Sequence, residues 1–235
     1  MTLAVRGLHA YYGNIHVLHG VDFDIAGGEI ATILGRNGSG RSTTCKAVMG
    51  ILKPAQGEVR LRGQNLAGQA GHNIARAGIG YVPEERLIFS TLTVEENLVM
   101  GQNEPRQGAA RWNMEELYAL FPRLKERRNV RAGYLSGGEQ QMLTIFRTLL
   151  GNPSVILVDE PTEGLAPKIV DVVGEVVLEM KRRGLAVVLL EQKLSMALRV
   201  TDTIMVMGHG QIVFSGTPEA FNDNPSIRRQ WLEVS

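Results

Sequence analysis

The stretch from Gly35 to Ser42, Gly-Arg-Asn-Gly-Ser-Gly-Arg-Ser, is the feature that most constrains the fold of this chain. It matches the phosphate-binding loop pattern Gly-x-x-x-x-Gly-Lys-Ser/Thr at every position but one, because Arg41 stands where lysine is expected. Such a loop turns its backbone N–H groups inward, and the positive end of the following helix adds to the attraction for an anion. The pattern therefore predicts a nucleoside triphosphate site between a strand and a helix.

The flanking residues provide that setting. Gly28 to Leu34 is a short apolar run, and Thr43 to Gly50 is typical of a helix closed by glycine. A glycine-rich turn that binds nothing is the alternative, and this context argues against it. Ser42 is the expected magnesium ligand. The expected phosphate contacts are Gly35, Arg36, Asn37, Gly38, Ser39, Gly40, Arg41, Ser42 and Thr43.

Composition limits the other possibilities. With 235 residues, 44% hydrophobic and 21% charged, the chain is typical of a globular protein with one domain or a core with a subdomain. A net charge of +1 gives no reason to expect a nucleic-acid partner, and the basic cluster between Arg123 and Arg131 is interpreted as a solvated face. No apolar run approaches the ~20 residues that span a bilayer, and no secretory signal is evident, so a cytoplasmic location is expected.

Metal and disulfide chemistry built on cysteine or histidine is not expected. The single cysteine, Cys45, excludes an internal disulfide and a thiolate cluster. The histidines show no ligand spacing, so they are interpreted as surface or packed residues; they are His9, His16, His19, His72 and His209.

Hydrophobic periodicity predicts an α/β fold. Val21 to Ile25 and Glu58 to Arg62 alternate as half-buried antiparallel strands do, whereas the region from about Phe89 to Leu150 has helical periodicity. Ser154 to Val158 and Ala186 to Leu190 are apolar runs of the kind buried in parallel sheets. Between them a helix is expected to begin at Pro167 and end at Gly184, which makes a parallel crossover unit. Gln102 to Arg111 is the most loop-like stretch.

Two further motifs carry chemistry. Asp159 and Glu160 end an apolar strand, where ligands bind in open parallel sheets. Asp159 is expected to hold magnesium directly or through water, and Glu160 to orient and deprotonate an attacking water. Solvent-facing acids are the alternative. In Leu135 to Gln141, Leu-Ser-Gly-Gly-Glu-Gln-Gln, a serine and two glycines precede a helix, which suits anion binding or simple capping.

The phosphate loop, LSGGEQQ and VDEP occur in the order and spacing of ATP-binding-cassette ATPases, and the resemblance covers the whole chain. It implies a P-loop NTPase (RecA-like) parallel-sheet core with an antiparallel β subdomain, formed by residues 1–88 and 151–235. Residues 89–150 would be a helical insertion subdomain carrying the signature motif. It also implies head-to-tail pairing, with ATP and Mg²⁺ between the phosphate loop of one chain and the signature residues of a second ATPase subunit or of another copy. Those residues are Ser136, Gly137, Gly138 and Glu139.

The same resemblance assigns further positions. Tyr12 looks like the aromatic on which adenine stacks, with a core tyrosine as the alternative. Glu84 stands where the family offers glutamine to magnesium, and Gln192 replaces the switch histidine, so it can hydrogen-bond the terminal phosphate but cannot carry a charge. Ala166 replaces an aspartate.

The combination of Glu84, Gln192 and Ala166 resembles the ATP subunits of branched-chain amino-acid importers, in particular the second, shorter one. Relatives that carry urea or other small amides are similar too. The resemblance implies a membrane permease as partner, contacted through Glu85 to Met100, an indirect link to a substrate-binding protein, and a peripheral position on the inner face of the cell membrane.

Arg41 leaves two expectations open. Arginine is longer than lysine and forked. In one expectation the site formed by this loop hydrolyses ATP poorly, while Ser136 to Gln141 complete a competent site on the partner's loop. In the other, the cavity adjusts around Arg41 and hydrolysis is kept. A nucleotide-binding regulatory subunit is a rival interpretation. A cassette ATPase acting on ribosomes or DNA is another, which would usually need a second cassette or a long coiled coil.

Overall fold

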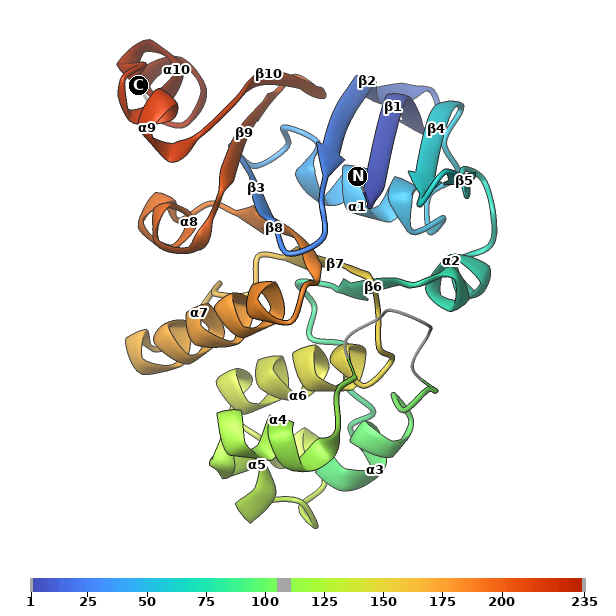
Figure 1. The fold of residues 1–235 in the computed structure, drawn as a ribbon, viewed down its shortest axis with the longest axis vertical. Helices are drawn as coiled ribbons and strands as arrows, with labels where there is room; N and C mark the ends of the chain where they lie inside the picture. The colour runs from blue at the N-terminus through green and yellow to red at the C-terminus, as the bar shows by residue number, and fades with distance from the viewer. Residues whose placement is uncertain (1, 105–110, 234–235) are drawn as a thin grey trace.

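The computed structural model describes residues 2–104 and 111–233, and its centre is a six-stranded sheet in the order β10-β9-β3-β8-β7-β6 (Figure 1). A four-stranded sheet, β2-β1-β4-β5, lies beside it. The strands are β1 (Leu3–Tyr12), β2 (Ile15–Ile25), β3 (Ile30–Gly35), β4 (Gln56–Leu61), β5 (Gln64–Asn65), β6 (Ile79–Val82), β7 (Val155–Asp159), β8 (Ala186–Glu191), β9 (Thr203–Gly208) and β10 (Gln211–Gly216).

The helices surround these sheets, and α3 to α6 gather at the bottom of Figure 1. They are α1 (Arg41–Val48), α2 (Gly71–Ala77), α3 (Val94–Val99), α4 (Met114–Leu120), α5 (Pro122–Glu126), the 3-10 helix Ala132–Tyr134, α6 (Gly137–Leu149), α7 (Pro167–Arg182), α8 (Leu194–Val200), α9 (Pro218–Asn222) and α10 (Pro225–Trp231).

Strand periodicity divides the core into two main layers. Because successive side chains on a strand point to opposite faces, Ile156 and Val158 of β7 pack with α6 and α7, whereas Val155 and Leu157 pack toward α1 and the four-stranded sheet. The side chains of β8 alternate between the same two layers. Both faces of these strands are therefore buried, which explains their unbroken apolar sequences.

The expected α/β fold with a parallel core is confirmed. β3, β8, β7 and β6 pair in parallel, β9 also runs parallel to β3, and β10 is antiparallel. The expected crossover is β7, α7, β8: Pro167 occupies the first turn of α7, and Gly184 follows its end with a φ of 82°. These parallel strands bring the ends of β3, β7 and β8 to one edge of the sheet.

The predicted antiparallel strands and helices are present with shifted ends. Val21 to Ile25 lies within the longer β2, and the strand predicted at Glu58 to Arg62 is β4, which begins and ends earlier. α1 begins at Arg41 rather than Thr43, and the region from Phe89 to Leu150 contains the short helices α3, α4 and α5 and the longer α6. In the predicted loop Gln102 to Arg111, residues 105–110 lie outside the described residues. Cys45 is buried within α1.

Across the described ranges, no helix is both long and apolar enough to cross a membrane.

Candidate nucleotide-binding site

The phosphate loop joins β3 to α1 in the way its sequence predicts. β3 ends at Gly35, and Gly40 precedes α1 with a φ of 110°, a left-handed conformation that favours glycine. Gly35 has no room for a side chain, because an added Cβ would lie 2.6 Å from Ser39 Oγ and 2.7 Å from the Met207 carbonyl oxygen. The two glycines thus allow the loop to turn tightly between strand and helix.

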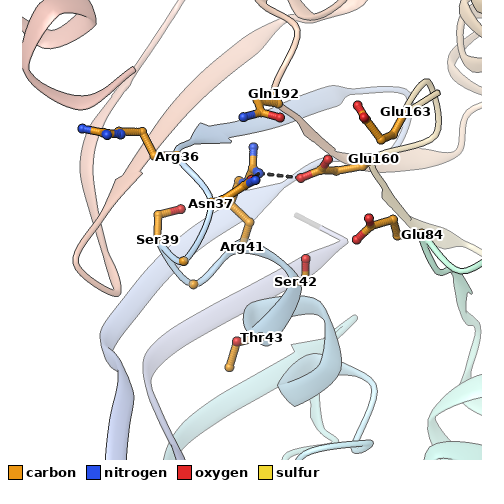
Figure 2. Close-up of a pocket in the computed structure, with 12 residues that line it drawn as sticks. Arg36, Asn37, Ser39, Arg41, Ser42, Thr43, Glu84, Glu160, Glu163 and Gln192 are labelled. Carbon is orange, nitrogen blue, oxygen red and sulfur yellow. Dashed lines mark hydrogen bonds and ion pairs between the residues drawn. The ribbon is translucent and has the colours of Figure 1, made fainter. Parts of the chain in front are cut away.

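The loop lines a cavity of about 270 Å³ at the carboxyl edge of the parallel sheet (Figure 2). Residues from four separated segments of the chain meet there: Arg36, Asn37, Gly38, Ser39, Gly40, Arg41, Ser42, Thr43, Glu84, Glu160, Glu163 and Gln192. The cavity therefore combines the predicted phosphate loop with three of the predicted chemical positions, Glu84, Glu160 and Gln192.

Asp159 ends β7 and contacts Ser42, which lines this cavity. It is buried, and its carboxylate accepts hydrogen bonds from Ser42 Oγ at 3.1 Å and from the Tyr81 hydroxyl at 3.3 Å. Burial raises the pKa of Asp159, and these two hydrogen bonds oppose that shift. Sequence reasoning missed Tyr81, because its contact depends on the pairing of β6 with β7.

The residues around Asp159 fit a magnesium ion. Ser42 supplies a hydroxyl close to the carboxylate, and Glu84 lines the adjacent cavity. Within the described ranges, no three histidine, cysteine, aspartate or glutamate residues could hold a metal among themselves. A hydroxyl with one or two carboxylates suits Mg²⁺, which often takes one or two carboxylates and completes its shell with phosphate oxygens and water.

Arg41 is folded into the site rather than displaced from it. Its side chain is 4% exposed, and it donates from Nη1 to the Glu191 carbonyl oxygen at 2.8 Å. From Nη2 it donates to Asn37 Oδ1 at 3.3 Å and to Glu160 Oε1 at 2.5 Å. Figure 2 shows Arg41 and Glu160 directed toward each other across the cavity. The arginine thus connects the start of α1 with the ends of β7 and β8.

Glu160 occupies a backbone conformation that is uncommon for a residue with a side chain. Its φ is 42°, and its N–H donates to the Leu190 carbonyl oxygen at 3.0 Å. Burial raises the pKa of Glu160, although the neighbouring Arg41 opposes the shift. A carboxylate with a raised pKa at the rim of a phosphate-sized cavity is suited to accept a proton.

Gln192 is exposed and lines the cavity directly after β8. The preceding Glu191 is buried and accepts hydrogen bonds from Thr162 Oγ1 at 2.8 Å and from the Lys193 N–H at 3.3 Å. Burial raises the pKa of Glu191. Glu191 and Glu163 were not predicted, and their contacts join segments that lie apart in the sequence.

Ser136, Gly137, Gly138 and Glu139 lie at the beginning of α6 and line none of this cavity. Ser136 Oγ accepts from the Glu139 N–H at 3.3 Å, and a Glu139 carboxylate oxygen accepts from the Ser136 N–H at 2.8 Å. This is a capping box, so the capping interpretation is confirmed for the isolated chain. Arg123 and Arg127 form ion pairs with Glu139, and Arg123 is still 55% exposed, so the basic cluster remains a largely solvated face, as predicted.

Tyr12 ends β1 and is 46% exposed, which excludes the alternative of a core tyrosine. It does not line the phosphate cavity. Its neighbour Tyr11 stacks on His16 with ring centroids 4.1 Å apart. Tyr12 therefore remains a predicted base contact.

Comparisons with known proteins agree with this geometry. Residues 18–163 match the family model described as ABC transporter. The high-affinity branched-chain amino acid transport ATP-binding protein BraG of Pseudomonas aeruginosa is 43% identical over 230 residues, 98% of this chain and 99% of that protein. The probable branched-chain amino acid transport ATP-binding protein LivF of Archaeoglobus fulgidus is 33% identical over 97% of both chains. A solved ADP conformation of an ATP-binding cassette of an ABC transporter has a TM-score of 0.82 and 26% identity, covering 97% of each chain. The chain belongs to the ABC transporter family, and its α/β fold is that of the family's ATP-binding cassettes.

Proposed function

We propose that this chain is the ATP-binding and hydrolysing subunit that energises import of branched-chain amino acids through a membrane permease, by nucleotide-driven dimer closure. The observation that carries the proposal is the convergence of the phosphate loop, Ser42, Glu160 and Gln192 on one cavity. The similarity over nearly full length to BraG supports the choice of solute.

The site residues have distinct proposed roles. The loop N–H groups and Arg41 bind the phosphates, and Glu160 accepts the proton of the attacking water. Gln192 donates a hydrogen bond to the terminal phosphate. Ser42, Asp159 and Glu84 would hold Mg²⁺, which neutralises phosphate charge when bound. Tyr12 supports the adenine ring by stacking.

A second subunit completes the site in this proposal. Ser136 is exposed at the N-terminus of the long helix α6, where free N–H groups and the helix dipole favour an anion. Because Ser136 to Glu139 do not reach their own cavity, they are proposed to contact ATP held by a partner's loop. The partner is a different ATPase subunit or another copy of this chain.

The permease is proposed to dock in a groove of about 810 Å³ beside the edge strand β6. Phe89 and Met100 line it and are 47% and 64% exposed. Arg147, which also lines the groove, lies 4.8 Å from the centre of the Phe89 ring. Exposed apolar side chains in a groove suit a short helix of a membrane partner. This contact would place the chain peripherally on the inner face of the membrane, with a substrate-binding protein acting through the permease.

A poorly hydrolysing, nucleotide-binding half of an asymmetric pair is the second candidate. The Arg41–Glu160 ion pair favours it, because the proposed base is engaged by the residue that replaces lysine. Magnesium-dependent ATP hydrolysis by the purified chain at high concentration separates the two candidates, with nucleotide binding measured in parallel.

The proposed function predicts turnover that Glu160→Gln abolishes without loss of binding. If the chain binds nucleotide without hydrolysing it, and Arg41→Lys restores hydrolysis, the second candidate is supported instead. Loss of binding in every form would contradict both.

The solute requires a transport assay. In cells lacking the gene, this chain is expected to restore uptake of labelled leucine, and Glu160→Gln is expected not to. Restored uptake of urea or another small amide without leucine uptake would retain the ATPase proposal and overturn the assigned solute.

A further inference from the structure

We propose that the Arg41–Glu160 ion pair is a resting arrangement of the site, and that an entering nucleotide has to separate these two side chains. Arg41 would then act as a positioning residue that controls when Glu160 is available. This inference rests on the proposed function, because it assumes that phosphate groups enter the cavity that both residues line.

The pair is well shielded from water. Arg41 Nη2 and Glu160 Oε1 are 2.5 Å apart, and the two side chains are 4% and 11% exposed. Charged hydrogen bonds of this kind are stronger in a poorly solvated site than on the surface, and removing either partner leaves an unpaired buried charge. In the resting arrangement each of the two charges is therefore satisfied by the other.

The shape of arginine makes this arrangement possible. One terminal nitrogen of the guanidinium binds the Glu191 carbonyl oxygen, and the other binds Glu160 and Asn37. Lysine has a single terminal nitrogen, so it cannot present two separate nitrogens in a fixed plane to these acceptors. A nucleotide that draws Arg41 toward its phosphates also releases the contacts at the ends of β7 and β8, next to Gln192.

Phosphates and Glu160 compete for the same cation. The Glu160 carboxylate lies across the cavity from the loop, so it repels an entering phosphate while it retains Arg41. The apparent affinity for nucleotide is then reduced by the fraction of molecules in which the ion pair is closed. Removing the Glu160 charge should tighten nucleotide binding by more than the loss of a nearby charge alone accounts for.

Calorimetric ADP binding to the full chain tests this difference. Glu160→Gln is expected to lower the dissociation constant for ADP by about tenfold, because the ion pair no longer competes. Glu163→Gln is the matched control: it removes a carboxylate from the same cavity, and no ion pair of the Glu163 carboxylate occurs among the described residues. Glu163→Gln is expected to change the dissociation constant for ADP by no more than about threefold, because an exposed charge repels phosphate only weakly.

Repeating the measurement in a chain with lysine at position 41 tests whether the effect depends on the arginine. Glu160→Gln is also measured in an Arg41→Lys background, where its effect is expected to fall to that of Glu163→Gln. Glu160→Asp, whose shorter side chain draws back from Arg41, provides an independent weakening of the pair and is expected to tighten ADP binding only where Arg41 is retained. This variant serves if Glu160→Gln does not fold.

The outcomes separate the two proposals. Equal gains from Glu160→Gln and Glu163→Gln overturn the resting arrangement while the proposed function stands. Equal gains from Glu160→Gln with Arg41 retained and in the Arg41→Lys background overturn it in the same way. Failure of the wild-type chain and of every folded variant to bind ADP overturns the proposed function itself.

Discussion

The Ser42 hydroxyl lies 3.1 Å from a carboxylate oxygen of Asp159, although 117 residues separate the two in the chain. Ser42 belongs to the first turn of α1 and Asp159 ends β7, so the contact links the phosphate loop to a strand that is separated from β3 by β8 in the central sheet. It places a hydroxyl and a buried carboxylate at the proposed magnesium position.

Replacing Asp159 with asparagine should stabilise the nucleotide-free chain and abolish magnesium-dependent hydrolysis. Burial raises the pKa of Asp159 above its usual 3.8, so the folded chain binds this proton more tightly than the unfolded chain does. The ionised form therefore lowers stability fully above the folded-state pKa, and the penalty disappears as the pH falls toward 3.8.

Asp159→Asn is expected to raise the free energy of unfolding at neutral pH, as followed by thermal or urea unfolding. The gain should shrink as the pH falls. The exposed Asp223→Asn is the control and should change little. A lower stability for Asp159→Asn at neutral pH would show that the hydrogen bonds of Asp159 outweigh its burial.

Tyr12→Ala should weaken ATP binding by roughly 5- to 150-fold, corresponding to the ~1–3 kcal/mol of a stacked base. Tyr11→Ala is the natural control, because Tyr11 is also exposed but stacks on His16. Fluorescent-nucleotide titration measures both. Equal losses from the two variants would point to a general disturbance of the β1–β2 turn, and no loss from Tyr12→Ala would remove it from the site.

The contiguous parts of the site could be predicted from the sequence. The loop from Gly35 to Thr43 is one short segment whose glycine spacing dictates a local conformation, and the apolar run before Asp159 identifies a buried strand. The capping box of Ser136 and Glu139 is equally local. In each case the residues that determine the structure are within a few positions of one another.

The contacts between segments could not be predicted in this way. Strand order places β8 between β3 and β7, and no local pattern fixes that order. Tyr81 reaches Asp159 only because β6 pairs with β7. The pairing of Arg41 with Glu160 depends on the direction of a long side chain and on the left-handed backbone of Glu160, neither of which residue spacing determines.

Gly208→Ala should loosen the C-terminal helix α10. An added Cβ at Gly208 would lie 2.2 Å from two ring carbons of Trp231, so the indole has to move away. The expected loss of stability is about 1–3 kcal/mol, typical of overpacking. Fluorescence in a Trp112→Phe background reports Trp231 alone and should shift to the red. An unchanged spectrum would mean that the Trp231 contact is not maintained in solution.

Ser136→Ala separates capping from nucleotide contact. Ser136 caps α6 and Thr93 caps α3 with the same capping box, so alanine at either position should lower the free energy of unfolding by about 1 kcal/mol. Only Ser136 is proposed to contact the partner's ATP. Ser136→Ala should therefore also reduce ATP hydrolysis by the paired subunits, and Ser136→Arg should reduce it further by filling the space next to the phosphate.

Both measurements are made on soluble subunits without permease, so the location of α3 beside the proposed docking groove does not affect the comparison. If Thr93→Ala and Ser136→Ala lower hydrolysis equally, the loss reflects stability, and Ser136 has no separate role. If Ser136→Arg leaves hydrolysis by the paired subunits normal, the signature residues of this chain do not complete the partner's site. Under the second candidate, in which the Arg41 loop hydrolyses ATP poorly, that loss could then not be offset by a competent site across the interface.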